Sequence, residues 1–154
     1  MFQFGYLTPR QRYYWGLRRQ GTTESEISRR VGITRQAVNK IMDTVDSKVT
    51  KALVETAHVN RVEIGQLDPI KGYLAGFSPQ FHTKVFITLS PRSGITVWYD
   101  YKGECEYACV HQGISCRQIL FREATDRGIT LPENKERMPL SELANFIFTK
   151  IVES

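Results

Sequence analysis

Three segments near the start of the chain each combine an apolar helical stripe with a threonine placed just before it. They are residues 8–20, 23–31 and 34–45. The hydroxyl groups of Thr8, Thr23 and Thr34 suit the helix start, where a free backbone N–H needs an acceptor. Gly21 and Gly32 permit the left-handed turn that ends many helices. The pattern predicts three short helices, the last two joined by a turn of roughly three or four residues as a helix-turn-helix.

The third segment has one apolar face and one polar face. Its apolar positions follow the spacing i, i+1, i+4 and i+8, and they are Ala37, Val38, Ile41 and Val45. The polar side chains near its start are Arg35, Gln36, Asn39 and Lys40. Arginine and lysine suit the major-groove edge of guanine, and glutamine and asparagine suit adenine. Because a helix-turn-helix inserts the start of its second helix into the major groove, this face predicts contacts with base edges.

Residues 46–60 contain no glycine or proline, and apolar residues recur every four positions at Val45, Val49, Leu53 and Ala57. This spacing predicts a helix, which either continues from the third segment or follows it after a kink near residues 46–47. The stripe has two interpretations that do not exclude each other. It packs against the protein's own core, or it forms the seam of a dimer.

Strand patterns begin in the second part of the chain. Residues 62–80 hold three glycines and two prolines, which predict a loop-rich linker with a short strand at 61–64. Residues 84–89 and 95–101 are rich in β-branched and aromatic side chains. Together with the five turn residues between them, they predict a hairpin. Residues 104–110 are a candidate third strand.

Two helical patterns complete the chain. Ser115 and Gln118 have the spacing of a capping box for a helix over 116–127, and Gly128 suits its end. An amphipathic pattern then runs from Leu140 to the C-terminus. These helices, combined with the strands, predict an α+β fold. We expect a helix-turn-helix domain with its connecting helix over residues 1–60, and a small antiparallel sheet with helices, for dimerisation or sensing, over 61–154.

Charge separates the same two parts. The chain has 154 residues and a net charge of +5. Its first 60 residues hold ten Lys or Arg against five Asp or Glu, whereas the remainder holds eleven of each. All of the excess positive charge therefore lies in the first part. A localised basic excess attracts nucleic acid, although a solvated, arginine-rich surface is the alternative interpretation.

The stretch LTPRQRYYWGLRRQGTTESEISRRVGITRQAVNKI resembles the helix-turn-helix shared by LuxR-type regulators and sigma-factor region 4. The matching positions are Leu7, Thr8, Arg10, Gln11, Leu17, Gly21, Thr23, Glu26, Ile27, Val31, Gly32, Thr34 and Val38. The phrase that begins at Thr34 is also similar to the archaeal Tfx regulators, in which a helix-turn-helix precedes an unrelated C-terminal part. Ser28 and the bulky residues 13–15 depart from the pattern at packing positions. The resemblance covers less than a third of the chain and implies a transcription regulator that binds double-stranded DNA.

The predicted DNA contacts fall into two groups. We expect the major groove to be contacted by Thr34, Arg35, Gln36, Asn39 and Lys40. We expect phosphates to be approached by Arg10, Thr23, Arg29 and Arg30. A single small DNA-binding domain binds weakly, and many such domains form two-fold symmetric dimers that bind two half-sites. We therefore also expect a homodimer.

Four possible metal ligands occur within twelve residues: Cys105, Cys109, His111 and Cys116. Three thiolates and an imidazole suit zinc, and three thiolates could hold an iron–sulfur cluster. The spacing matches no standard zinc motif, and a strand over 104–110 would separate Cys105 from Cys109 by about 13 Å. Buried free cysteines are the alternative.

Several classes of protein are disfavoured by what the sequence lacks. No catalytic triad, phosphate-binding loop or metalloprotease motif is visible, so we do not expect an enzyme. No apolar run is long enough for a membrane span, and no secretory signal is visible, so we expect a cytoplasmic protein without a membrane partner. Two other hypotheses remain beside the regulator: a protein-interaction adaptor, and a metal or redox sensor centred on the cysteines.

Overall fold

The computed structural model describes residues 6–100, 110–111 and 114–154. Its elements, in chain order, are α1 (Pro9–Arg19), α2 (Glu24–Val31), α3 (Arg35–Val59), β1 (Glu63–Asp68), β2 (Tyr73–Ser78), β3 (Thr83–Ser90), β4 (Gly94–Tyr99), β5 (Val110–His111), β6 (Ile114–Ser115), α4 (Cys116–Asp126) and α5 (Leu140–Glu153). Strands β1 to β4 form an antiparallel sheet in sequence order. The predicted α+β class is confirmed, with the N-terminal helices preceding the sheet.

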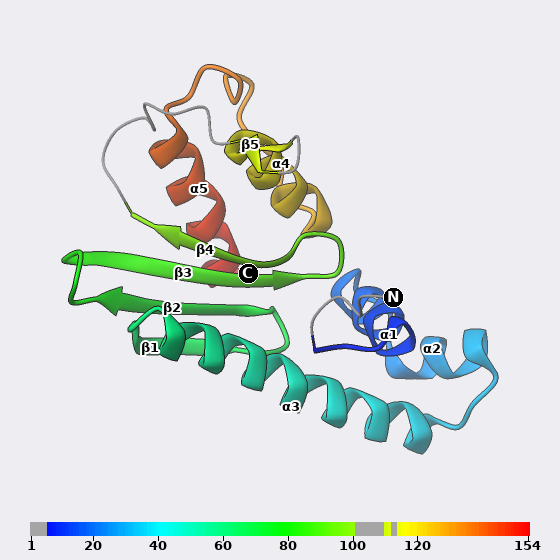
Figure 1. The fold of residues 1–154 in the computed structure, drawn as a ribbon. Helices are drawn as coiled ribbons and strands as arrows, with labels where there is room; N and C mark the ends of the chain where they lie inside the picture. Colours follow the sequence, from blue (N-terminus) through cyan, green and yellow to red (C-terminus); the bar gives the residue numbers. More distant parts are fainter. Residues whose placement is uncertain (1–5, 101–109, 112–113) are drawn as a thin grey trace.

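The sheet has a helical layer on each face (Figure 1). Helix α3 runs along one face, and α4 and α5 cover the other. Successive side chains of β3 point to opposite faces of the sheet. Val85 and Ile87 are buried on the α3 side, and Phe86 packs on the α5 side. The Phe86 ring stacks on Phe148 of α5, with ring centroids 4.6 Å apart.

The prediction of a loop-rich linker over residues 62–80 is wrong, because this segment forms the β1–β2 hairpin, although the short strand predicted at 61–64 overlaps the start of β1. Its glycines serve the strands and their turn. Gly72 has φ +70° in the turn, and a Cβ there would meet the Leu89 carbonyl oxygen at 2.5 Å and the Trp15 ring. A Cβ on Gly76 would meet Val62 and the backbone of β1. The glycines therefore mark close approaches inside a sheet. The β3–β4 hairpin is confirmed, although its connection is shorter than the predicted five residues.

Helix α3 is continuous over 25 residues and so is about 37 Å long. No kink occurs at residues 46–47, where Asp46 accepts a bidentate ion pair from Arg18 of α1, with the shorter N···O distance 2.5 Å. The stripe that includes Val49 and Leu53 is fully buried against α1 and the sheet. Of the two interpretations of the stripe, the structure therefore supports packing within the chain's own core.

One hydrophobic cluster crosses the predicted domain boundary between residues 60 and 61. It contains Trp15 of α1, Leu53 of α3, and Leu74 and Ile87 of the sheet. A second cluster lies between the sheet and the helices α4 and α5. The boundary itself stays a prediction, and the helix-turn-helix shares its core with the sheet.

A buried ion pair at the end of α4 is linked to the turn between β1 and β2. The Glu123 carboxylate accepts a hydrogen bond from Arg127 Nε at 2.6 Å, and both side chains are at most 8% exposed. The other nitrogens of Arg127 donate to the backbone carbonyls of Lys71 and Gly72. Every nitrogen of the guanidinium therefore has a partner, which is what a buried cation requires.

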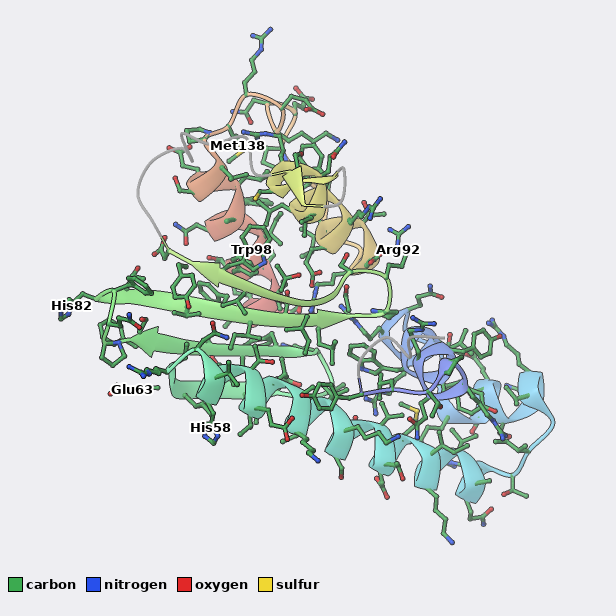
Figure 2. All side chains as sticks on the ribbon, viewed as in Figure 1. His58, Glu63, His82, Arg92, Trp98 and Met138 are labelled. Atoms are coloured by element: carbon green, nitrogen blue, oxygen red, sulfur yellow. The ribbon has the colours of Figure 1, made fainter. Side chains whose placement is uncertain are left out.

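Arg19 of α1 reaches the same place, the junction at which α4 meets the β1–β2 turn and the end of β3. Its guanidinium lies over the Trp15 ring and donates to the Leu89 carbonyl oxygen at 3.2 Å. Burial, and then the nearby Arg127 charge, lower the pKa of Arg19 to about 10, while Glu123 acts in the opposite direction. On the solvent side, Arg92 in the β3–β4 turn pairs with Asp126 of α4 at 2.6 Å, and Figure 2 labels Arg92 at this corner.

The junction generates a stability prediction. Glu123→Gln keeps the shape of the side chain but removes the carboxylate that pairs with the buried Arg127 guanidinium and that, together with Asp126, favours the charged form of Arg19. We expect the free energy of unfolding to fall by about 3 kcal/mol, as when one partner of a buried ion pair is lost. Urea denaturation measures this. Glu153→Gln is the control, because its exposed pairing with Lys150 at 3.9 Å is worth at most about 1 kcal/mol. Equal losses in the two variants would show that Glu123 does not hold the junction.

Candidate nucleic-acid interface

The helix-turn-helix is formed by α2, a three-residue turn and α3. Gly32 ends α2 with φ +73°, and its N–H donates to the Ser28 carbonyl at 2.9 Å. Ile27 and Val38 are fully buried where the two helices pack. The predicted turn and the predicted helix starts are therefore present, and they fix the angle at which α3 leaves the turn.

The three threonines cap their helices as the sequence predicts. Thr8 and Thr23 form capping boxes with Gln11 and Glu26. The Thr34 hydroxyl accepts from the Ala37 N–H at 3.1 Å. Thr34 therefore has a structural task besides any contact with DNA, because its hydroxyl already holds the first turn of α3.

The structure places all the predicted DNA contacts at the surface. The exposed side chains are Arg10, Thr23, Arg29, Arg30, Thr34, Arg35, Gln36, Asn39 and Lys40. In α3 they alternate with Val38 and Met42, which are at most 2% exposed. Among the described residues, Arg29 and Arg30 of α2 and Arg35 and Lys40 at the start of α3 make no ion pair. Four exposed positive charges near the turn are thus available to an anion.

The start of α2 carries acidic charge beside the predicted phosphate contact at Thr23. The Glu26 carboxylate accepts from the Thr23 N–H at 3.2 Å, and Glu24 occupies the first helical position. Two carboxylates in a first turn stabilise the helix but oppose the approach of a phosphate there. The Glu24 carboxylate also faces the Asn39 amide, a contact across the turn that no local pattern would reveal.

Arg10 is held on its own helix. Its Nε donates to the Tyr14 hydroxyl at 3.0 Å, and its guanidinium lies 5.5 Å from the centre of that ring. Tyr14 itself is buried. Arg10 therefore presents its charge from a fixed position at the start of α1.

Most of the cysteine cluster lies outside the described residues, including Cys105, Cys109 and nearly all of the predicted strand 104–110. The backbone of His111 belongs to β5, and Cys116 opens α4 as a free, half-buried thiol. Within the described part of the chain, no three His, Cys, Asp or Glu side chains gather as a metal site. Figure 2 shows His58 on the α3 side and His82 at one end of the sheet, well separated.

Comparison with known proteins gives no match: no family model, no curated protein and no solved structure is significantly similar to this chain. Among the described residues, no helix is long and apolar enough to cross a membrane.

The double task of Thr34 generates a prediction. Thr34→Ala removes the acceptor for the Ala37 N–H, so we expect the free energy of unfolding to fall by about 1 kcal/mol without any DNA present. Thr34→Ser keeps a hydroxyl cap and should match the wild type. Urea denaturation of the three proteins measures the effect. Equal stability of the alanine and serine variants would contradict a capping role.

Proposed function

We propose that this chain is a sequence-specific, double-stranded DNA-binding transcription regulator. The observation that carries the proposal is the polar face of α3, where the exposed side chains of Arg35, Gln36, Asn39 and Lys40 stand beside a buried apolar stripe. The basic excess of the first 60 residues and the helix-turn-helix connection support it. The resemblance to LuxR-type, sigma-factor region 4 and Tfx helix-turn-helix segments points the same way.

In this proposal the contacts divide by chemistry. Arg35 and Gln36, in the first turn of α3, reach base edges in the major groove. Arg29 and Arg30, near the end of α2, neutralise phosphates without reading sequence. Because acidic side chains surround the start of α2, we assign the main phosphate contacts to these two arginines instead of to Thr23.

The proposal includes a homodimer. A helix-turn-helix contacts few base pairs, and two-fold pairing on adjacent half-sites multiplies both affinity and specificity. Because the apolar stripe of α3 is buried within its own chain, the dimer contact is formed by other surfaces.

Base-contacting and phosphate-contacting residues should respond differently to substitution. Arg35→Ala or Gln36→Ala should relax sequence preference at a cost of about 1–3 kcal/mol on the preferred site. Arg29→Ala should weaken binding to all sequences. It should also reduce the salt slope, which is the steepness with which the logarithm of the binding constant falls with the logarithm of salt concentration, by about one. The measurement is binding to fragments of the protein's own genome over a salt series.

Lys51→Ala is the matched control for charge. This lysine lies on the same helix as Arg35, in the half that packs on the sheet, and its side chain is 68% exposed. Its removal should leave both sequence preference and salt slope nearly unchanged. Retention of the wild-type preference by Arg35→Ala and Gln36→Ala would contradict the placement of α3 in the groove. Absence of salt-dependent binding in the wild type would favour the protein-interaction adaptor.

The dimer generates its own prediction. We expect two chains on each specific site, and two half-sites separated by one helical turn of DNA, about 34 Å. Sedimentation velocity of the protein with a single-site duplex measures the stoichiometry, and footprinting measures the spacing. A complex of one chain with one uninterrupted site would contradict the dimer while leaving DNA binding intact.

A further inference from the structure

A groove lies between α1 and the turn that joins β3 to β4, two segments that are neighbours in Figure 1. Its volume is about 630 Å³, within the range of roughly 300–1,000 Å³ that small-molecule sites occupy. Helix α1 supplies one wall, and Pro91 and Arg92 of the turn supply the other. The walls are close at Gly16, where a Cβ would lie 3.9 Å from Pro91 Cγ. No residue of α3 lines this groove, so it is separate from the proposed base-contacting face.

The walls of the groove are mainly apolar. Pro9 and Pro91 come from opposite walls, and Leu17 adds an aliphatic side chain from α1. The Tyr13 side chain also lines the groove and is 55% exposed. Among the described residues its ring contact is with Tyr14, tilted, with ring centroids 6.0 Å apart. An exposed ring beside apolar walls favours a ligand with an aromatic body, because aromatic pairs gain more than their buried area alone provides.

The polar side chains of the groove give it a positive charge. Arg92 directs Nε and Nη2 to the Asp126 carboxylate at 2.7 and 2.6 Å, so its charge is largely balanced. Arg12, on the opposite wall, makes no side-chain hydrogen bond or ion pair within the described part of the chain. A guanidinium matches a carboxylate with two parallel N–H···O bonds. The groove thus combines apolar walls with one arginine that lacks an anionic partner.

We infer that this groove binds a small aromatic carboxylate. The aromatic body packs between the two walls and against Tyr13, and the carboxylate accepts hydrogen bonds from Arg12. Such a ligand contacts α1 and the β3–β4 turn at once, and Arg92 of that turn pairs with α4. Binding therefore adds a link between the helix-turn-helix part and the second helical layer. The inference concerns a surface apart from α3 and does not depend on the proposed DNA-binding function.

The first test titrates one probe, 2-naphthoate, into the full chain by isothermal titration calorimetry. We expect saturable binding of one probe to each chain. The neutral analogue 2-naphthamide has nearly the same shape, and we expect it to bind at least about tenfold more weakly because the charged hydrogen bonds are lost. Decahydro-2-naphthoate keeps the charge but has saturated rings, and it should bind at least about threefold more weakly than 2-naphthoate.

Two substitutions test the walls of the groove. Arg12→Met removes the charge and should lower the affinity for 2-naphthoate at least about tenfold, while leaving the affinity for 2-naphthamide unchanged. Arg122→Met is its matched control, because Arg122 is an exposed arginine of α4 outside the groove. Gly16→Leu places a side chain beside Pro91 and should abolish binding by filling the groove. Gly16→Ala, whose methyl group fits at 3.9 Å, should bind like the wild type.

Amide chemical shifts in NMR spectra locate the probe, and we expect changes in α1 and the β3–β4 turn. No saturable binding of 2-naphthoate up to about 5 mM would overturn the inference. So would wild-type affinity in both Arg12→Met and Gly16→Leu, or shift changes confined to other elements. Equal affinity for either analogue would overturn the chemical class of the ligand.

The same variants test whether a second copy of the chain occupies the groove instead. Sedimentation velocity should give the same number of associated chains for Gly16→Leu as for the wild type. A change in that number, together with no binding of 2-naphthoate, would assign the groove to contact between chains and overturn the inference. None of these results bears on DNA binding by α3, so the two proposals fail separately.

Discussion

The burial of α3 against the sheet positions every other part of the proposed interface. The second half of the helix, including Val49 and Leu53, is enclosed by α1 and the sheet. The first half carries the polar face on which the proposal rests. Because no break separates the halves, the orientation of the proposed base-contacting side chains depends on a hydrophobic contact several turns away. The Arg18–Asp46 ion pair adds a polar tie between α1 and the middle of the same helix.

The second helical layer is tied to this arrangement through buried charge. Arg127 links α4 to the turn between β1 and β2, and Arg19 extends from α1 to the same place. Charged groups in such surroundings contribute little net stability as pairs, but the loss of one partner is costly. The junction therefore favours one relative placement of three elements that are far apart in sequence.

Local signals account for what the sequence predicted well. Threonine caps, a glycine turn and four-residue spacing depend on neighbours within a few positions, so α1, α2 and the start of α3 follow from them. The β1–β2 hairpin was missed because Gly72 and Gly76 resemble loop residues until the structure brings other backbone close to them. The Glu24–Asn39 contact and the burial of Arg19 depend on tertiary neighbours that no sequence spacing specifies.

Helix α3 is continuous, so a change in its tilt against the sheet also moves its N-terminal end. Over its length of about 37 Å, a tilt of about 5° at the C-terminal end displaces the N-terminal end by about 3 Å, as much as the length of a hydrogen bond. A small change in how α3 packs on the sheet therefore produces a larger displacement at the end that is proposed to contact bases. The fidelity with which this protein would select its site is consequently a property of its hydrophobic core as much as of the side chains that meet the DNA.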